Sequence, residues 1–329
     1  MLQHGCSRGH HTGSKTRVGR DVGKILMLRK LTRTLRAFGR ELRLFSTAPA
    51  PSRTPSIGLA LGGGFARGMA HIGVLKVFEE EKIPINFVAG TSVGALIGAA
   101  YCSGITVAEL EEIAARVRFR DFARWTLSRY GFYTNERMTG FLSKTLKART
   151  FEELRIPLAV AATDFSTGEA VVFDSGPLID PVRASCAYPG MFLPVSIGGR
   201  LLVDGLLGHA VPTIPLRQMG AERVVAIYLS GGWVNPEGPR HVFEIVGQCF
   251  SIAQAKMSSL WQKAADLVIQ PDVNGFGYDA FDHAPELIRV GEAAARAALP
   301  ELRRWLPPAA SQAAKRAGVR PAPAQPSPA

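Results

Sequence analysis

Ser92 is the side chain whose surroundings in this sequence best suit covalent chemistry. It is the centre of Gly90-Thr91-Ser92-Val93-Gly94, a G-x-S-x-G pattern flanked by apolar residues. Glycine on both sides relieves crowding at a sharp turn, so a serine between a strand and a helix exposes its hydroxyl there as a nucleophile. Packing of a tight turn is the alternative, because the pentapeptide alone is a weak motif.

A glycine-rich segment, LALGGGFARG at residues 59–68, lies upstream of this serine. Glycine lets backbone N–H groups approach a ligand closely, and the start of a helix adds partial positive charge. Such a loop either cradles a phosphate or stabilises an oxyanion; a merely tight turn is the structural alternative. The dinucleotide pattern G-x-G-x-x-G does not fit, because Phe65 or Arg67 occupies a required glycine position.

A serine nucleophile needs a base, and Asp204 is the best candidate. It ends an apolar segment and is followed by Gly205, although an Asx turn would explain it too. Asp164 is a rival that resembles a turn residue between paired strands. None of the histidines considered lies in a persuasive position for a base; these are His71, His209, His241 and His283.

The elements that must position these groups alternate between strands and helices. Short apolar segments predict strands at 57–61, 85–89, 157–163, 170–173, 223–229 and 267–270, and Gly198-Gly199 predicts a hairpin turn. Helical spacing predicts helices at 66–82, 93–101, about 241–264 and 284–299, a capped helix after Thr106 and one through 138–146. This alternation favours a mainly parallel sheet with helices on both faces.

The ends of the chain differ from its centre in charge and composition. Residues 1–55 carry twelve Lys and Arg against two acidic residues, and apolar residues at 22–45 follow the spacing of an amphipathic helix. This helix could lie on an anionic membrane, pack on its own domain or serve as a targeting presequence; no nucleic-acid motif is present. We expect a basic arm at 1–55, a catalytic domain at 56–306 and a disordered Pro/Ala-rich tail at 307–329.

Cysteine usage and hydropathy indicate the compartment. The four cysteines form no C-x-x-C pair, which is typical of a reducing environment. The longest apolar run, 95–102, is far shorter than the roughly 18 residues of a membrane span. We therefore expect a cytoplasmic protein, peripheral on the inner membrane face if the arm binds there.

Together these segments resemble the patatin-like phospholipases, closest to the short bacterial kind, over about residues 57–300. The segments that carry the resemblance are the glycine loop ending Ala66-Arg67-Gly68, the elbow at Ser92, ATDFSTGE at 162–169, RASCAYPGMFLPV at 183–195, and Asp204-Gly205. The resemblance implies a three-layer α/β/α fold and a Ser-Asp dyad that uses no histidine, metal or cofactor.

The resemblance also implies a role for each matching residue. Ser92 would be the nucleophile and Asp204 the base. The remaining positions are the oxyanion hole at Gly62, Gly63, Gly64 and Phe65, its supports Arg67 and Gly68, and the elbow glycines Gly90 and Gly94. Two residues depart from the family: Phe65 replaces a common glycine, and Leu206 replaces a small residue.

The expected activity is serine acyl hydrolysis of a lipid or fatty-acyl ester through an acyl-serine intermediate. An apolar groove near Phe65, Tyr188, Met191 and Phe192 would hold the acyl chain. A thioesterase or transacylase using the same dyad and a non-catalytic interaction protein are the alternatives. A nucleotide-binding oxidoreductase is disfavoured by the glycine spacing.

Overall fold

The computed structural model describes residues 54–128, 131–229, 238–239 and 242–307. The amphipathic segment at 22–45 and the tail from 308 onward lie outside the described residues. The division into arm, domain and tail therefore stays a prediction. Within the described ranges, no helix is long and apolar enough to cross a bilayer.

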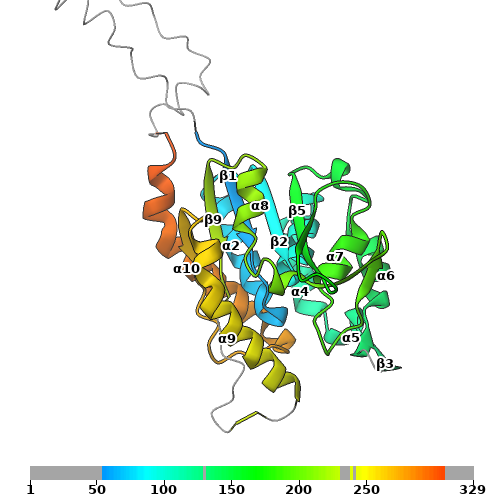
Figure 1. Ribbon diagram of the computed structural model, residues 1–329. Helices are drawn as coiled ribbons and strands as arrows, with labels where there is room; N and C mark the ends of the chain where they lie inside the picture. Colours follow the sequence, from blue (N-terminus) through cyan, green and yellow to red (C-terminus); the bar gives the residue numbers. More distant parts are fainter. Residues whose placement is uncertain (1–53, 129–130, 230–237, 240–241, 308–329) are drawn as a thin grey trace, which may run out of the picture. The chain divides into compact units, whose positions relative to one another are not determined.

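An eight-stranded mixed sheet forms the centre of the described chain (Figure 1). Its strands are β1 (Ile57–Leu61), β2 (Phe87–Thr91), β5 (Leu158–Asp164), β6 (Ala170–Phe173), β7 (Val195–Ile197), β8 (Arg200–Asp204), β9 (Arg223–Ile227) and β10 (Leu267–Ile269). They are ordered β10-β9-β1-β2-β5-β8-β7, with β6 also paired to β5. The first five of that order are parallel, while β6 and β8 run antiparallel to β5 and β7 runs antiparallel to β8. The sheet is therefore mainly parallel, as predicted.

Helices connect and cover these strands. They are α2 (Ala70–Glu80), α3 (Val93–Cys102), α4 (Val107–Arg116), α5 (Phe119–Phe122), α6 (Glu136–Thr145), α7 (Ile179–Ser185), α8 (Thr213–Gln218), α9 (Val242–Gln262) and α10 (Ala284–Arg304). Short 3₁₀ segments are η1 (Phe65–Met69), η2 (Phe151–Glu153), η3 (Gly205–Leu207) and η4 (Phe281–His283). A separate two-stranded hairpin pairs β3 (Arg124–Ser128) with β4 (Gly131–Thr134).

The two faces of the sheet carry side chains of different size. In β1, Leu59 and Leu61 face a large apolar core shared with α2, α3, α4, α6 and α10. On the opposite face, Ala60 and Ala89 pack with residues of α8 and with Trp261 of α9. Because alternate strand residues point to opposite faces, both faces are buried, which gives the predicted three layers of helix, sheet and helix.

Two local predictions are confirmed in detail. Thr106 and Glu109 form a reciprocal capping box at the start of α4, with Glu109 N–H donating to Thr106 Oγ1 at 3.2 Å. Gly198 and Gly199, with φ of 58° and 76°, form the turn between β7 and β8. Both depend on chemistry local to a few residues, which is why the sequence pattern sufficed.

Other elements were not predicted. These elements are the strands β3 and β4 and the helices α7 and α8, and each has only four to seven residues. Segments of that length are too short for apolar periodicity to distinguish them from loops. The first predicted helix is also divided, because residues 65–69 form η1 and the α-helix begins only at Ala70.

Candidate active site

Ser92 occupies a sharp turn between β2 and α3. Its backbone has φ 56° and ψ −124°, a conformation that costs a non-glycine residue about 1–3 kcal/mol. A Cβ on Gly90 would lie 2.5 Å from the Cα of Ala95, and one on Gly94 would overlap the carbonyl oxygen of Leu61. Both glycines of the pattern are therefore required by close approach of the backbone.

Hydrogen bonds from distant segments hold this turn in place. The N–H of Ser92 donates to Ser185 Oγ at 2.8 Å, and Ser185 Oγ donates to the carbonyl of Ala161 at 2.6 Å. Thr91 Oγ1 donates to the carbonyl of His209 at 2.6 Å. Ser185 is fully buried in α7, yet the sequence distinguished it only as one residue of the matching segment 183–195.

Asp204 reaches the same edge of the sheet from β8. Strand β5 lies between β2 and β8, with Ala161 opposite Thr91 and Ala162 opposite Asp204. The side chain of Asp204 is fully buried, and its Oδ1 accepts the N–H of Leu206 at 3.0 Å. The end of β8 and the end of β2 thus bring a carboxylate and a hydroxyl to neighbouring positions.

The electrostatics of Asp204 suit a base. Burial raises the pKa of Asp204 from 3.8 to about 7, while hydrogen bonding with the Ser92 side chain and with the N–H of Leu206 lowers it. Oδ2 of Asp204 is buried and has no hydrogen bond of normal geometry among the described residues. Asp204 therefore interacts with the Ser92 side chain without a hydrogen bond of normal geometry at Oδ2.

The glycine loop lies against Ser92, but its N–H groups are not equivalent. A Cβ on Gly63 would lie 3.5 Å from the Cβ of Ser92. Gly62 N–H donates to the carbonyl of Ile227 at 3.1 Å, and Gly63 N–H makes a long bond of 3.4 Å to that of Ala210. Gly62 therefore differs from the prediction, because its N–H anchors the loop to β9 instead of facing an oxyanion.

His71 and η1 support the loop from behind. His71 is fully buried and its Nε2 lies 2.8 Å from the carbonyl oxygen of Gly62. Burial lowers the pKa of His71 to about 4, so we assign a neutral ring that donates from Nε2. Arg67 Nε donates to the carbonyl of Phe276 at 2.9 Å, and Gly68 allows η1 to approach Val93. The sequence suggested a capping or packing histidine, whereas the structure shows one that positions the loop.

Phe65 adopts an unusual backbone conformation at the end of the loop. Its φ is 51°, in the left-handed region that favours glycine. The ring packs edge-on against Tyr188 at 4.9 Å and Tyr278 at 5.9 Å between ring centroids. These ring contacts offset part of the backbone strain, since aromatic pairs contribute about 0.5–1.5 kcal/mol.

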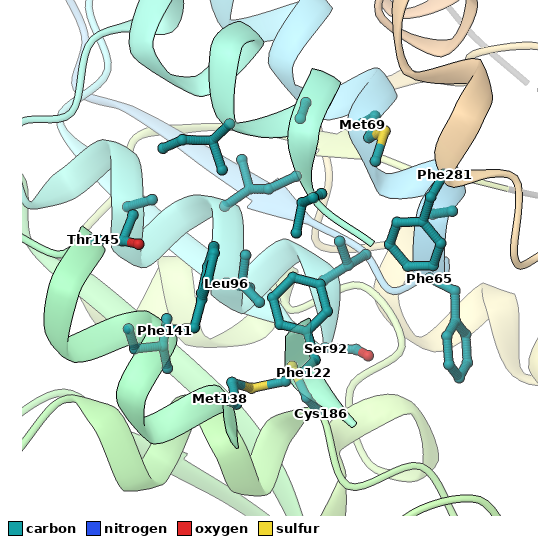
Figure 2. Close-up of a pocket in the computed structure, with 18 of the residues that line it drawn as sticks. Phe65, Met69, Ser92, Leu96, Phe122, Met138, Phe141, Thr145, Cys186 and Phe281 are labelled. Atoms are coloured by element: carbon teal, nitrogen blue, oxygen red, sulfur yellow. The ribbon is translucent and has the colours of Figure 1, made fainter. Parts of the chain in front are cut away.

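An apolar cavity of about 110 Å³ opens at Ser92. Figure 2 shows Ser92 between Phe65 and an interior bounded by Phe141 and Met138. The other walls come from η1, α3, α4, α5, α6 and η4. Phe65 and Phe192 line this cavity as predicted, but Tyr188 and Met191 do not. The prediction missed the walls from α3, α4 and α6, because the same apolar spacing also serves a solid core.

A second, more polar cavity of about 330 Å³ also contains Ser92. The glycine loop, Tyr188 and Leu206 form one side of it. Helix α9 contributes polar side chains from the other side, namely Gln248, Ser251 and Gln254. Ser92 thus lies where an apolar and a polar cavity meet.

Two of the remaining candidates, Asp164 and His283, make contacts of a structural kind. Asp164 Oδ1 accepts the N–H groups of Ser166 and Thr167 at 2.9 and 3.2 Å, as expected of a turn residue. The ring of His283 packs on Phe276, and His241 lies outside the described residues. Burial lowers the pKa of His209, whose backbone carbonyl accepts the hydrogen bond from Thr91 in the elbow.

The described cysteines, Cys102, Cys186 and Cys249, are free thiols. Burial raises the pKa of Cys186, and a hydrogen bond with the Ser92 side chain opposes that shift. Across the described ranges, no group of three His, Cys, Asp or Glu side chains is arranged to hold a metal ion.

Comparisons with known proteins bear on the family of this domain. The family model for patatin-like phospholipase matches residues 59–217. An uncharacterized NTE family protein of Mycobacterium tuberculosis is 34% identical over 188 residues, covering 56% of this chain and 52% of the relative. A patatin-like phospholipase domain-containing protein of Caenorhabditis elegans is 32% identical, covering 75% of this chain and 21% of the relative. Lysophospholipase NTE1 of Mycosarcoma maydis is 27% identical, covering 81% of this chain and 15% of the relative.

This chain therefore spans about half the length of the mycobacterial relative and a smaller part of the other two. Among solved structures, VipD from Legionella pneumophila aligns with a TM-score of 0.46 and 14% identity, covering 76% of this chain and 67% of VipD. The family model spans the glycine loop, the elbow at Ser92 and the segment that ends at Asp204. The chain belongs, through this domain, to the patatin-like phospholipase family.

Proposed function

We propose that this protein hydrolyses fatty-acyl esters of lipids through an acyl intermediate on Ser92. One observation carries the proposal: Asp204 and the loop containing Gly63 both lie beside Ser92, and Ser92 lines an apolar cavity. A hydroxyl, a buried base and backbone N–H donors are the groups that acyl transfer needs. The apolar cavity supplies a site for an acyl chain.

In the first half-reaction, Asp204 accepts the proton of Ser92 as Oγ attacks the ester carbonyl carbon. The carbonyl oxygen becomes an oxyanion that accepts hydrogen bonds from the N–H groups of Gly63, Gly64 and Phe65. One such donor contributes about 3 kcal/mol to stabilising the transition state. The ester bond then breaks, and Asp204 returns the proton to the departing alcohol.

In the second half-reaction, water replaces the alcohol. Asp204 accepts a proton from the water as its oxygen attacks the acyl carbon. The tetrahedral species collapses, the proton passes to Ser92 Oγ, and the fatty acid leaves. The pKa of about 7 for Asp204 suits this cycle, because a base near the working pH both accepts and returns protons readily.

The two cavities suggest how a lipid is oriented. The acyl chain would enter the apolar cavity, while the alcohol portion would lie in the polar cavity beside Gln248 and Gln254. Several relatives bear the name lysophospholipase, so a phospholipid or lysophospholipid is the proposed substrate class. The polar cavity also leaves room for an acceptor other than water, so acyl transfer is the second candidate.

The test uses purified full-length protein, a panel of acyl esters and thioesters, and a fluorophosphonate that labels activated serines. We expect ester hydrolysis, and mass spectrometry should locate the label on Ser92. Ser92→Ala should lose both ester hydrolysis and labelling. Ser166 lies in the β5–β6 turn, and Ser166→Ala should keep both activities. Equal hydrolysis by parent and Ser92→Ala would refute the assignment. Preferential acyl transfer to an added alcohol would favour the transacylase.

A further inference from the structure

The hairpin β3–β4 exposes an aromatic pair at the edge of the described chain, beside α5 in Figure 1. The side chain of Trp125 is 61% exposed and that of Phe132 is 42% exposed. Their ring centroids are 5.7 Å apart. Large aromatic rings stacked together in water form an apolar patch that marks an interaction surface.

Aromatic contacts connect this pair to the apolar cavity. Trp125 packs edge-on against Tyr133 at 5.4 Å, and Tyr133 packs against Phe119 at 5.2 Å, between ring centroids. The ring of Phe119 lies 5.9 Å from that of Phe192, and both of these residues line the cavity that opens at Ser92. The exposed rings therefore form the outer end of a continuous apolar path to the proposed acyl site.

The backbone fixes the hairpin to the rim of the cavity. The N–H of Tyr133 donates to the carbonyl of Met191 at 2.9 Å, and the N–H of Leu193 donates to the carbonyl of Tyr133 at 3.0 Å. Phe192, between those two residues, is a wall of the cavity. Whatever surface the hairpin contacts will therefore lie next to the cavity.

The surroundings of the aromatic pair are basic. The described residues between 118 and 137 include four arginines and two acidic residues. Arg124 pairs with Glu136 at 2.8 Å and Arg118 with Asp282 at 3.1 Å. Arg120 is exposed, and no salt bridge to it occurs among the described residues. Positive charge around exposed aromatic rings complements an anionic lipid headgroup region.

We propose that the Trp125–Phe132 face of the hairpin inserts into the interface of an anionic phospholipid bilayer and holds the cavity opening at the membrane. This docking role rests on the proposed lipid hydrolysis for its purpose, because an acyl chain could then leave the bilayer along the aromatic path. A membrane fits better than a protein partner because the ring contacts lead to an apolar cavity and the flanking sequence is rich in arginine.

Binding is measured without turnover, on full-length Ser92→Ala protein that also carries Trp125→Ala and Phe132→Ala. Vesicles of phosphatidylcholine, with and without phosphatidylglycerol, are sedimented with the protein. Losing both rings should lower the partition coefficient on anionic vesicles on the order of tenfold or more. The matched control, Phe165→Ala, removes a ring that is 63% exposed in the β5–β6 turn and should bind as the parent does.

A second readout reports insertion of the hairpin itself. Bromine-labelled lipids should quench tryptophan fluorescence in the Ser92→Ala parent, and Trp125→Phe should lose most of that quenching while still binding. Thermal unfolding of each variant verifies that it is folded. Unchanged partitioning of the double variant, an equal loss in Phe165→Ala, or quenching that survives Trp125→Phe would overturn the docking role. Hairpin-dependent binding by a protein that hydrolyses no ester would uphold docking and refute the proposed function instead.

Discussion

Replacing Asp204 by asparagine should abolish activity and yet stabilise the folded protein above neutral pH. Burial raises the pKa of Asp204 from 3.8 to about 7, so ionising it in the folded state costs about 4 kcal/mol more than in the unfolded chain. Asparagine carries no charge to bury, so the variant avoids this cost. Its Oδ1 can keep the bond from Leu206 N–H, but its amide hydrogens replace the unpartnered Oδ2. Burying these amide hydrogens without acceptors costs about 1–3 kcal/mol. The free energy of unfolding of the variant should therefore exceed that of the parent by about 1–3 kcal/mol at pH 8.

The stability difference between the variant and the parent should change with pH in one direction. Between pH 3.8 and about 7, folded Asp204 keeps its proton while the unfolded chain loses it. The contribution of Asp204 to the free energy of unfolding therefore falls as pH rises through this window and is constant above it. Asparagine has no such dependence, so the difference between variant and parent should grow from about zero or below near pH 4 to its full value at pH 8.

The assay is urea unfolding of both full-length proteins at several pH values from 4 to 8, with ester hydrolysis measured on the same samples. Other titrating groups are common to both proteins and cancel in the difference. If the two unfolding free energies stay parallel across this range, Asp204 does not ionise as a buried, destabilised carboxylate. Loss of activity without any pH-dependent stability difference would likewise contradict the reasoning about its burial.

Three further predictions follow from the site. The parent's kcat/KM should fall about tenfold per pH unit below pH 7, as Asp204 becomes protonated, and a pH-independent rate down to pH 5 would contradict this. Thr145 lies at the end of the cavity remote from Ser92 in Figure 2, so Thr145→Phe should fill that end. Hydrolysis of long-chain esters should then fall roughly tenfold relative to hydrolysis of short-chain esters. The control is Thr139→Phe, on the same helix but outside the cavity lining. Ser185→Ala leaves the N–H of Ser92 without its acceptor, so we expect about 1–3 kcal/mol less stability and a lower kcat in steady-state kinetics; unchanged kcat would show that this bond does not position the nucleophile.

The sequence by itself determined the features that depend on neighbouring residues. The G-x-S-x-G spacing predicted the elbow because glycines at 90 and 94 are the residues that the close backbone approach there admits. The capping box at Thr106 and the turn at Gly198-Gly199 have equally local causes. Buried strands alternating with helices favoured a mainly parallel sheet, because such strands need cover on both faces.

The tertiary structure alone decided what depends on groups far apart in the chain. It shows that Gly62 N–H is bound to Ile227 and that Ser185 supports the elbow from α7. It also shows Asp204 fully buried, which raises its pKa, and an apolar cavity lined by residues of α3, α4 and α6. Hydrogen-bond partners, desolvation and cavity shape are properties of the assembled fold, because each is set by which distant side chains and backbone groups come into contact.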